Sequence, residues 1–383
     1  MEVKNYNQPV DASLFPEGCP RCSLLKFLLH LVPVAAVGLW GAYAAFRVLA
    51  HGLGETGLDD YFGFGLWITF DLAVIALGAG AFFTGALRYL LNIDALKNII
   101  NLTVVVGFLC YSGAMLVLVL DIGQPLRAWF GYWHPNVHSM LTEVIFCITC
   151  YCTVLIIEYV PLALENRQLA KNKLAHAIAH NFHLIMPLFA GIGAFLSTFH
   201  QGSLGGMYGV LFGRPYILRD GFFIWPWTFF LYILSAVGSG PMFTVLVCTF
   251  MEKLTGRKLV SWDVKQLMGK IAGTMFTIYM VFKLIDTAGW VMDILPRSGM
   301  TFDQMFHGWI YGKWLLFAEL VVCGILPAYL LFSKKCRSNP EMGIWSIRML
   351  LCFHSCFYQF FCFHPVNRSG VTGFSEEGCF AGS

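Results

Sequence analysis

The chain has few charged side chains. Only 12% of its 383 residues are Asp, Glu, Lys or Arg, while 57% are hydrophobic. Soluble domains carry about 25% charged residues, so the composition argues against a water-soluble globular protein. The net charge of +3 gives no strong attraction for polyanions, and the sequence holds no zinc-finger spacing or RNA-binding signature. The low net charge and the missing motifs therefore argue against a nucleic-acid partner.

Long apolar runs dominate the sequence. A bilayer core about 30 Å thick needs about 20 mostly apolar residues to span it, and backbone amides in lipid must bond within their own segment. The runs therefore predict helices, because none shows the short alternating segments of a membrane β-barrel. Eight runs meet the length, and a ninth is weaker: about 26–50, 64–91, 98–121, 139–163, 178–200, 222–250, 268–293, 307–332 and, in the ninth place, 344–364.

The predicted fold is accordingly all-α: a polytopic membrane helix bundle with eight transmembrane helices and a doubtful ninth. We divide the chain into a cytoplasmic leader (1–25), a transmembrane bundle (26–335) and an atypical C-terminal tail (336–383). Most of the Lys and Arg residues fall in the leader and the even-numbered loops. Because positive loops stay in the cytoplasm, the N-terminus is predicted to be cytoplasmic and the odd-numbered loops to face outward.

Ionisable side chains inside spans are costly and are candidates for function. Asp71 lies in the outer part of the second run, Glu319 lies near the middle of the eighth, and His200 ends the fifth at the predicted outer surface. Asp71 and Glu319 have no basic neighbour in the sequence, so a functional interpretation is favoured. Lys283 and Asp286 share one helical face, where they either neutralise each other or form part of a proton path.

Other ionisable residues favour a structural interpretation. Glu143, Glu158 and Lys313 lie near span ends, where long side chains reach the interface. A stripe of histidines, His176, His180 and His183, leaves a b-type haem open as an alternative. A haem would need a second axial His, and only His30 is at matching depth. No metal site is predicted, because Cys19–Cys22 lacks a second Cys pair and the Cys and His residues of the tail follow no familiar ligand spacing.

Two loop segments carry a family resemblance. Leu120-Asp-Ile-Gly-Gln-Pro-Leu-Arg127, followed by Trp129 and Asn136, is similar to the LDLGRP segment of NrfD-like membrane proteins. Leu196-Ser-Thr-Phe-His-Gln-Gly-Ser-Leu-Gly-Gly206 resembles a stretch in the longer, HybB-like branch of that family. Within the branch, the likeness is strongest to membrane subunits of the high-molecular-weight cytochrome complexes of sulfate-reducing bacteria.

The resemblance implies a function that spacing alone does not. NrfD-like subunits are haem-free, act with a ferredoxin-like iron–sulfur subunit, and bind or serve a quinone. In this branch the complex often includes a multihaem cytochrome c and other membrane subunits. The resemblance thus implies a subunit of a respiratory complex in a bacterial inner membrane, linking hydrogen oxidation to sulfate reduction through a menaquinone-type quinone. Matching positions carry over Asp71, Asp121, Arg127, His200 and Gln201, whereas Gly202 departs from the usual Ser.

The end of the chain does not follow this resemblance. The longer branch has ten spans, but after about residue 341 this sequence becomes a Cys-, Phe- and His-rich run followed by a polar end. We expect a truncated or frame-shifted end, and an unbroken reading frame in the resequenced coding DNA would contradict this expectation.

The sequence thus predicts a quinone-interacting membrane subunit. Reducing a quinone takes up two protons, so a titratable group must lie within reach, and we assign this role to Asp71 or His200. We expect these two side chains to converge in one lipid-shielded cavity close to the periplasm. Tyr111 or Tyr132 would donate a hydrogen bond to the quinone, and Glu319, Lys283 and Asp286 would extend a proton path inward. Besides the haem b subunit, two alternatives stay open: a proton-coupled transporter and a purely structural anchor. Whether the subunit itself takes part in catalysis is also open.

Overall fold

The structure is a computed structural model that describes residues 23–56, 66–164, 172–211, 225–255, 258–297, 299, 301–305 and 313–339. Within these residues it contains helices and no strand, which confirms the all-α prediction. The main helices are α1 (Leu24–His51), α2 (Leu66–Tyr89), α3 (Ile100–Asp121), α4 (Phe130–Trp133), α5 (Met140–Leu164), α6 (Lys173–Leu211), α7 (Trp225–Thr255), α8 (Trp262–Gly289), α11 (Lys313–Phe317) and α12 (Leu326–Phe332).

Shorter elements complete the described chain. They are the 3₁₀ segments η1 (Leu53–Thr56), η2 (Asp94–Asn98) and η3 (Pro125–Arg127), the π-helical segments η7 (Trp290–Ile294) and η8 (Ala318–Ile325), and the short helices α9 (Leu295–Arg297), α10 (Phe302–Met305) and α13 (Lys334–Ser338). The π-helical segments continue α8 and join α11 to α12.

Seven helices in the described part of the chain are long and apolar enough to cross a membrane. They are α1 to α3 and α5 to α8, and they coincide with the first seven predicted runs. The eighth run contains α11, η8 and α12, of which Leu320–Phe332 is an apolar helix shorter than a span. The predicted count of eight is therefore not confirmed, and the doubtful ninth run and the tail lie outside the described residues.

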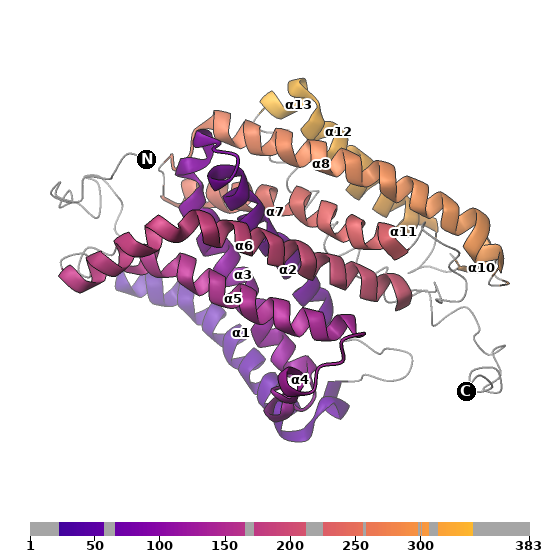
Figure 1. Ribbon diagram of the computed structural model, residues 1–383, viewed down its shortest axis with the longest axis horizontal. Helices are drawn as coiled ribbons and strands as arrows, with labels where there is room; N and C mark the ends of the chain where they lie inside the picture. The colour runs from indigo at the N-terminus through magenta and orange to yellow at the C-terminus, as the bar shows by residue number, and fades with distance from the viewer. Residues whose placement is uncertain are drawn as a thin grey trace.

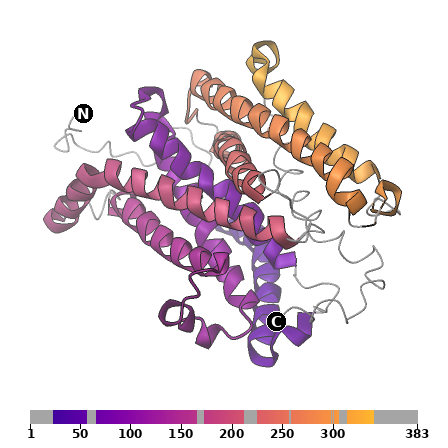
Figure 2. The same cartoon turned by 45° about the vertical axis from the view of Figure 1, so that its right-hand side comes forward.

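The helix α2 lies at the centre of the bundle (Figures 1 and 2). It packs against α3, α6 and α7, while α5 packs against α6 and α3. One hydrophobic cluster fills the space among α2, α3, α5 and α6, and a second lies around α7, α8 and α12. The helix α1 has no buried residue, and it contacts α3 at the edge of the bundle.

A close crossing of backbones joins the two clusters. At the contact of α2 with α7, a Cβ atom added to Gly80 would lie 2.2 Å from the Cα of Gly240. Small residues let membrane helices approach in this way, because packing rather than hydrophobic burial drives their association. The hydroxyl of Thr84 donates to the carbonyl of Gly80 at 2.7 Å. The crossing fixes the depth of α2, and therefore of Asp71, relative to α7.

The helix α6 is longer than the sequence predicted. Its run was expected to end at His200 and to be followed by a glycine-rich loop, but the helix continues to Leu211. Gly202 shows why: a Cβ atom there would lie 2.2 Å from the ring of Phe229 on α7. Glycine therefore serves close helix packing at this position and does not form a turn. The prediction that His200 ends its span at the outer surface was wrong.

The connection between α7 and α8 is held by a buried ion pair. Glu252 bonds to Lys265, and its Oε1 accepts hydrogen bonds from the backbone N–H groups of Leu259 at 2.9 Å and Val260 at 3.1 Å. The Lys265 side chain is only 7% exposed. Glu252 thus pairs with the ammonium group of Lys265, which also bonds to the Thr249 hydroxyl at 3.3 Å, and holds two backbone donors of the connection.

We expect Glu252→Ala to destabilise the protein by about 2–3 kcal/mol, because it leaves the buried ammonium group of Lys265 without its carboxylate and with only the Thr249 hydroxyl as a partner. Thermal unfolding of the purified protein in detergent measures this effect. The matched control is Asp94→Asn at the Arg88–Asp94 pair, where the Asp94 side chain is 88% exposed and the loss should be below about 1 kcal/mol. Equal losses in the two variants would contradict the assignment.

Candidate functional site

Three aromatic side chains meet in the centre of the first cluster. Tyr111 of α3 and Tyr151 of α5 are fully buried, and their ring centroids lie 4.0 Å apart in an edge-on arrangement. His200 of α6 is also fully buried, with its ring centroid 6.4 Å from that of Tyr111. Tyr111 lies halfway along α3, so His200 is positioned deep in the bundle. The site therefore places an imidazole and two phenols together, away from the loops.

Several polar atoms of this cluster have no hydrogen-bond partner among the described residues. They are the hydroxyls of Tyr111, Tyr151 and Ser203, both ring nitrogens of His200 and the amide nitrogen of Gln201. Ser197 and Gln201 are polar neighbours of the Tyr111 hydroxyl. A buried donor or acceptor left unpaired costs about 1–3 kcal/mol. Tyr111, Tyr151, Ser197 and Gln201 lie within reach of one another, and in this arrangement these atoms still hold hydrogen-bonding capacity that is not used.

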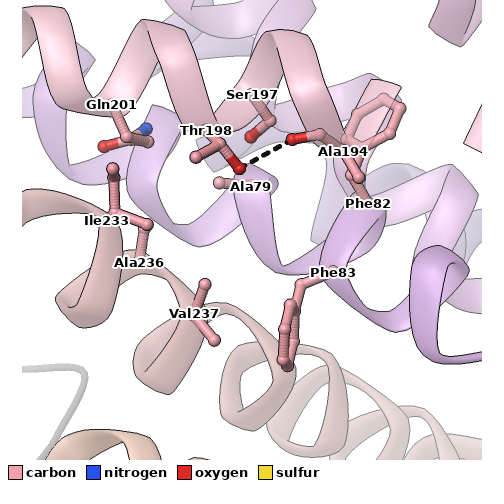
Figure 3. A pocket seen from close by; sticks show the side chains of 10 residues that line it. All are labelled: Ala79, Phe82, Phe83, Ala194, Ser197, Thr198, Gln201, Ile233, Ala236 and Val237. Atoms are coloured by element: carbon pink, nitrogen blue, oxygen red, sulfur yellow. Dashed lines mark hydrogen bonds between the residues drawn. The ribbon is translucent and has the colours of Figure 1, made fainter. Parts of the chain in front are cut away.

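A small cavity adjoins this cluster between α2, α6 and α7 (Figure 3). Ser197 and Gln201 line it from α6, and Phe82 and Ala79 line it from α2. Its volume is about 30 Å³. Sites for small molecules measure about 300–1,000 Å³, whereas a water needs only about 10–15 Å³. The cavity accommodates water and not a quinone ring, and neither Asp71 nor His200 lines it.

Asp71 belongs to a second polar group, at the end of the bundle where α3 ends. It is buried, and one carboxylate oxygen has no hydrogen-bond partner among the described residues. Its charged neighbour is Asp121, the last residue of α3. Asp121 in turn accepts a hydrogen bond from the indole N–H of Trp67 at 2.5 Å. Two carboxylates thus lie together, one buried and one half-buried, close to the surface.

The two polar groups lie at different depths. Gly78 of α2 is at the level of Tyr111, because a Cβ atom there would lie 2.8 Å from the Tyr111 ring. Seven residues of α2 separate Asp71 from Gly78, which corresponds to about 10 Å along the helix. Asp71 and His200 were expected to share one cavity. The geometry instead stacks the two groups along α2 and α3.

Arg127 and Tyr132 lie outside both polar groups. Arg127 is exposed and lines a surface depression together with Gly52, Leu53 and Gly123. Tyr132 lies on α4, with its hydroxyl 2.5 Å from that of Thr149 on α5. The structure therefore brings neither residue to His200. Their predicted role in binding the quinone stays a prediction.

The three residues predicted to form a proton path lie on α8 and η8, away from the two polar groups. Lys283 and Asp286 belong to α8, where Lys283 is half-buried and Asp286 is buried, and each has an interaction partner. Glu319 lies in the π-helical segment η8, and its side chain is outside what the structure describes. π-helical segments are frequent at functional sites. A role for these three residues in a proton path stays a prediction.

Sequence reasoning missed two buried polar residues. Tyr151 was overlooked because one Tyr in an apolar run gives no periodic signal, although its helix had been placed correctly. Glu158 was expected to reach the interface, but it is buried, and Tyr151 and Tyr89 are its neighbours. That expectation was wrong, since α5 turns this residue towards its neighbours. Lys313 is exposed and pairs with Asp303, and its expected reach to the membrane interface stays a prediction.

The histidines that suggested a haem lie on α1 and α6. His30 belongs to α1, where its Nδ1 lies 2.6 Å from the carbonyl oxygen of Lys26 in its own helix. His176 and His180 lie within the first eight residues of α6 and have interaction partners of their own. In the ranges that the structure describes, no three His, Cys, Asp or Glu side chains gather as metal ligands. The haem alternative is not tested by this arrangement.

The fold and the two polar groups define an integral membrane protein with a polar interior. The family model for the polysulphide reductase membrane protein NrfD matches residues 54–346, and the chain belongs to this family. This confirms the family resemblance drawn from the two loop segments.

Three individual proteins are similar to this chain over most of its length. The chain is 77% identical over 350 residues to the integral membrane subunit of a menaquinone reductase from Nitratidesulfovibrio vulgaris, covering 91% of this chain and 83% of the relative. It is 22% identical to a selenate reductase subunit of Mesobacillus selenatarsenatis, and the match covers 84% of this chain and 79% of the relative. A probable Ni/Fe-hydrogenase 2 b-type cytochrome subunit of Escherichia coli is 27% identical, and the match covers 77% of this chain and 71% of the relative.

Proposed function

We propose that this chain is the integral membrane subunit of a complex that reduces menaquinone. The relative with 77% identity bears that name, and the family match, over residues 54–346, covers the bundle from α2 onward. The observation that carries the proposal is the set of buried polar atoms without partners in a lipid-shielded core. A quinone is the kind of ligand such a core would serve, because it is apolar except at two carbonyl oxygens that need hydrogen bonds and protons.

The two polar groups would divide the chemistry between them. Converting a quinone to its quinol consumes two electrons and two protons, and a residue that supplies a proton must lie within hydrogen-bonding reach. Asp71, close to the end of the bundle and beside Asp121, would supply protons to a quinone bound there. Tyr111, His200 and Gln201 would form a hydrogen-bonding region about 10 Å deeper. Lys283, Asp286 and Glu319 would belong to a path towards the other end.

Electrons would come from partner subunits. We propose a ferredoxin-like iron–sulfur subunit, a multihaem cytochrome c and further membrane subunits as partners. The complex would lie in a bacterial inner membrane, with the N-terminus of this chain in the cytoplasm, and would link hydrogen oxidation to sulfate reduction. The relative named a menaquinone reductase subunit does not carry the name of the high-molecular-weight cytochrome complex, so assignment to that complex stays a prediction.

A pair of substitutions separates a role in quinone chemistry from a role in packing. Tyr111→Phe and Tyr151→Phe each remove a buried hydroxyl that has no partner in the described residues. We expect the thermal stability of the complex to stay unchanged or rise, because an unsatisfied group is lost. We also expect the turnover of a soluble menaquinone analogue to fall about tenfold, the equivalent of one hydrogen bond of about 1.4 kcal/mol.

The control is Tyr159→Phe on the same helix as Tyr151. Tyr159 stacks on Phe108 with ring centroids 4.7 Å apart, and phenylalanine keeps this contact. Its turnover and stability should match those of the wild type. Lower stability with unchanged turnover in the Tyr111 and Tyr151 variants would identify a packing role and contradict the proposal.

A haem b subunit remains a second candidate, since the relative from Escherichia coli carries the name of a b-type cytochrome. An optical spectrum of the purified subunit decides between the two. Haem absorbance that disappears in a His180→Ala variant would favour the cytochrome, whereas turnover that depends on Tyr111 without haem absorbance in this subunit would favour the quinone site.

A further inference from the structure

Three polar side chains meet where α2 begins and α3 ends. Trp67 and Asp71 are four residues apart on α2, so they lie on one face of that helix. The indole N–H of Trp67 donates a hydrogen bond at 2.5 Å to Asp121, the last residue of α3. Asp121 is also the charged neighbour of Asp71. Trp67 thus bonds to one carboxyl group of the pair and not to the other.

The two carboxyl groups cannot both be ionised at low cost. A buried charge is costly unless it is paired, and two carboxylates that share a site disfavour each other's ionisation. Within the residues that the structure describes, no basic side chain forms an ion pair with Asp71 or Asp121. A single proton on the pair would remove one of the two charges, and the two groups would compete for it.

The surroundings of the two groups favour different protonation states. Asp71 is 5% exposed, and one of its oxygens has no hydrogen-bond partner in the described chain. Asp121 is half-buried and accepts the indole N–H of Trp67. Hydrogen bonds to an ionised acceptor are about twice as strong as those between neutral groups, so this bond favours a negative charge on Asp121. Burial and the hydrogen bond both favour the proton on Asp71.

One effect opposes this assignment. Asp121 lies at the C-terminal end of α3, where the carbonyl groups without helical partners disfavour an anion. Asp71 lies in the second turn of α2, and the positive end of a helix acts mainly within the first turn. Without the indole N–H, the end of α3 would therefore shift the proton towards Asp121. The position of the proton thus depends on Trp67.

We propose that Trp67 is a positioning residue whose indole N–H keeps Asp121 as the carboxylate and Asp71 as the protonated acid. The use of this proton rests on the function proposed above. When a quinone is reduced with electrons from the partner subunits, the O–H bond of Asp71 breaks and its proton passes to a quinone carbonyl oxygen. Two adjacent carboxylates remain, and their repulsion favours the return of a proton to Asp71.

Carbodiimide labelling locates the proton, because dicyclohexylcarbodiimide forms a stable adduct with a protonated carboxyl group in apolar surroundings and not with a carboxylate. The purified full complex is treated with this reagent, and the peptides of this subunit are analysed by mass spectrometry. We expect the label on Asp71 and not on Asp121. Trp67→Phe removes the N–H and keeps an aromatic ring. The ratio of labelled Asp71 to labelled Asp121 should fall about tenfold or more, as expected for a lost hydrogen bond to a charged group.

A rescue variant separates the hydrogen bond from packing. In Trp67→Gln the ring is lost, but an amide N–H stands as many bonds from the Cβ atom as the indole N–H does. We expect this variant to restore the wild-type labelling ratio. Trp40→Phe on α1, where the side chain is 76% exposed, is the control and should be labelled like the wild type. A wild-type ratio in Trp67→Phe, or an altered ratio in Trp67→Gln, would overturn the proposal.

A second measurement needs no reagent to enter the site, so it also decides the case in which neither carboxyl group is labelled. Infrared difference spectra of the full complex are recorded as wild type minus Asp71→Asn and wild type minus Asp121→Asn. We expect the carbonyl band of a protonated carboxyl group in the first spectrum and carboxylate bands in the second. The reverse assignment, or no protonated-acid band in the first spectrum, would overturn the proposal.

Turnover of a soluble menaquinone analogue, measured on the same variants, separates this inference from the proposed function. A shifted label in Trp67→Phe with wild-type turnover would support the position of the proton and contradict the proposed use of Asp71. An unshifted label in Trp67→Phe, together with lost turnover in Asp71→Asn, would overturn the inference and leave the proposed function in place.

Discussion

Replacing Gly80 with alanine is expected to prevent the bundle from assembling. The new methyl group would lie 2.2 Å from the Cα atom of Gly240 and 2.2 Å from its carbonyl carbon, so it meets backbone and not a movable side chain. The helices α2 and α7 would have to separate, which opens both hydrophobic clusters. Overpacking of a core costs about 1–3 kcal/mol when side chains can adjust, and a clash with backbone exceeds that range.

The amount of complex in the membrane and its unfolding temperature measure this effect. We expect Gly80→Ala to reduce the recovered complex to a small fraction of the wild type, and Gly240→Ala to do the same. The control is Gly113→Ala on α3, because a Cβ atom there meets nothing within 4 Å. Wild-type recovery and stability of the Gly80 variant would show that the two helices do not cross as the structure has them.

The same crossing shows which features the sequence could predict. Hydropathy located α2 and α7 within a few residues, because the length of a membrane span is set by the bilayer. It could not show that Gly80 meets Gly240, since glycine alone does not indicate which helix approaches it. For the same reason Gly202 suggested a loop, although it serves the packing of Phe229 inside a continuous helix.

The sequence predicted two residues of the candidate site but not how they are arranged. Asp71 stood out because a carboxylate in an apolar run is unusual, and His200 stood out through its resemblance to a family segment. Neither signal indicates how deep in the bundle the residue lies. His200 was placed at the surface because its helix was taken to end there, and Tyr151 gave no signal because its role depends on Tyr111 across the bundle. Contacts between distant residues require the fold.

Asp71→Asn is expected to lower menaquinone-dependent turnover by about 100-fold or more, the range that a lost proton donor covers. Asparagine has nearly the shape of aspartate and keeps one acceptor oxygen, so packing around residue 71 is preserved. It cannot deliver a proton to a quinone. Removing a buried charge should also leave the stability unchanged or raise it, because one carboxylate oxygen of Asp71 has no partner in the described residues.

Steady-state turnover, thermal unfolding and co-purification of the other subunits, measured on the same preparation, separate these effects. Asp121→Asn should lower turnover less, because the asparagine oxygen still accepts the hydrogen bond from Trp67. Asp94→Asn, at an exposed position of η2, should leave turnover unchanged and lower the stability by less than about 1 kcal/mol. Wild-type turnover in the Asp71 variant would remove this residue from the proton chemistry and leave the deeper group around His200 as the remaining candidate. Lost turnover together with lost co-purification would instead show that Asp71 acts through assembly.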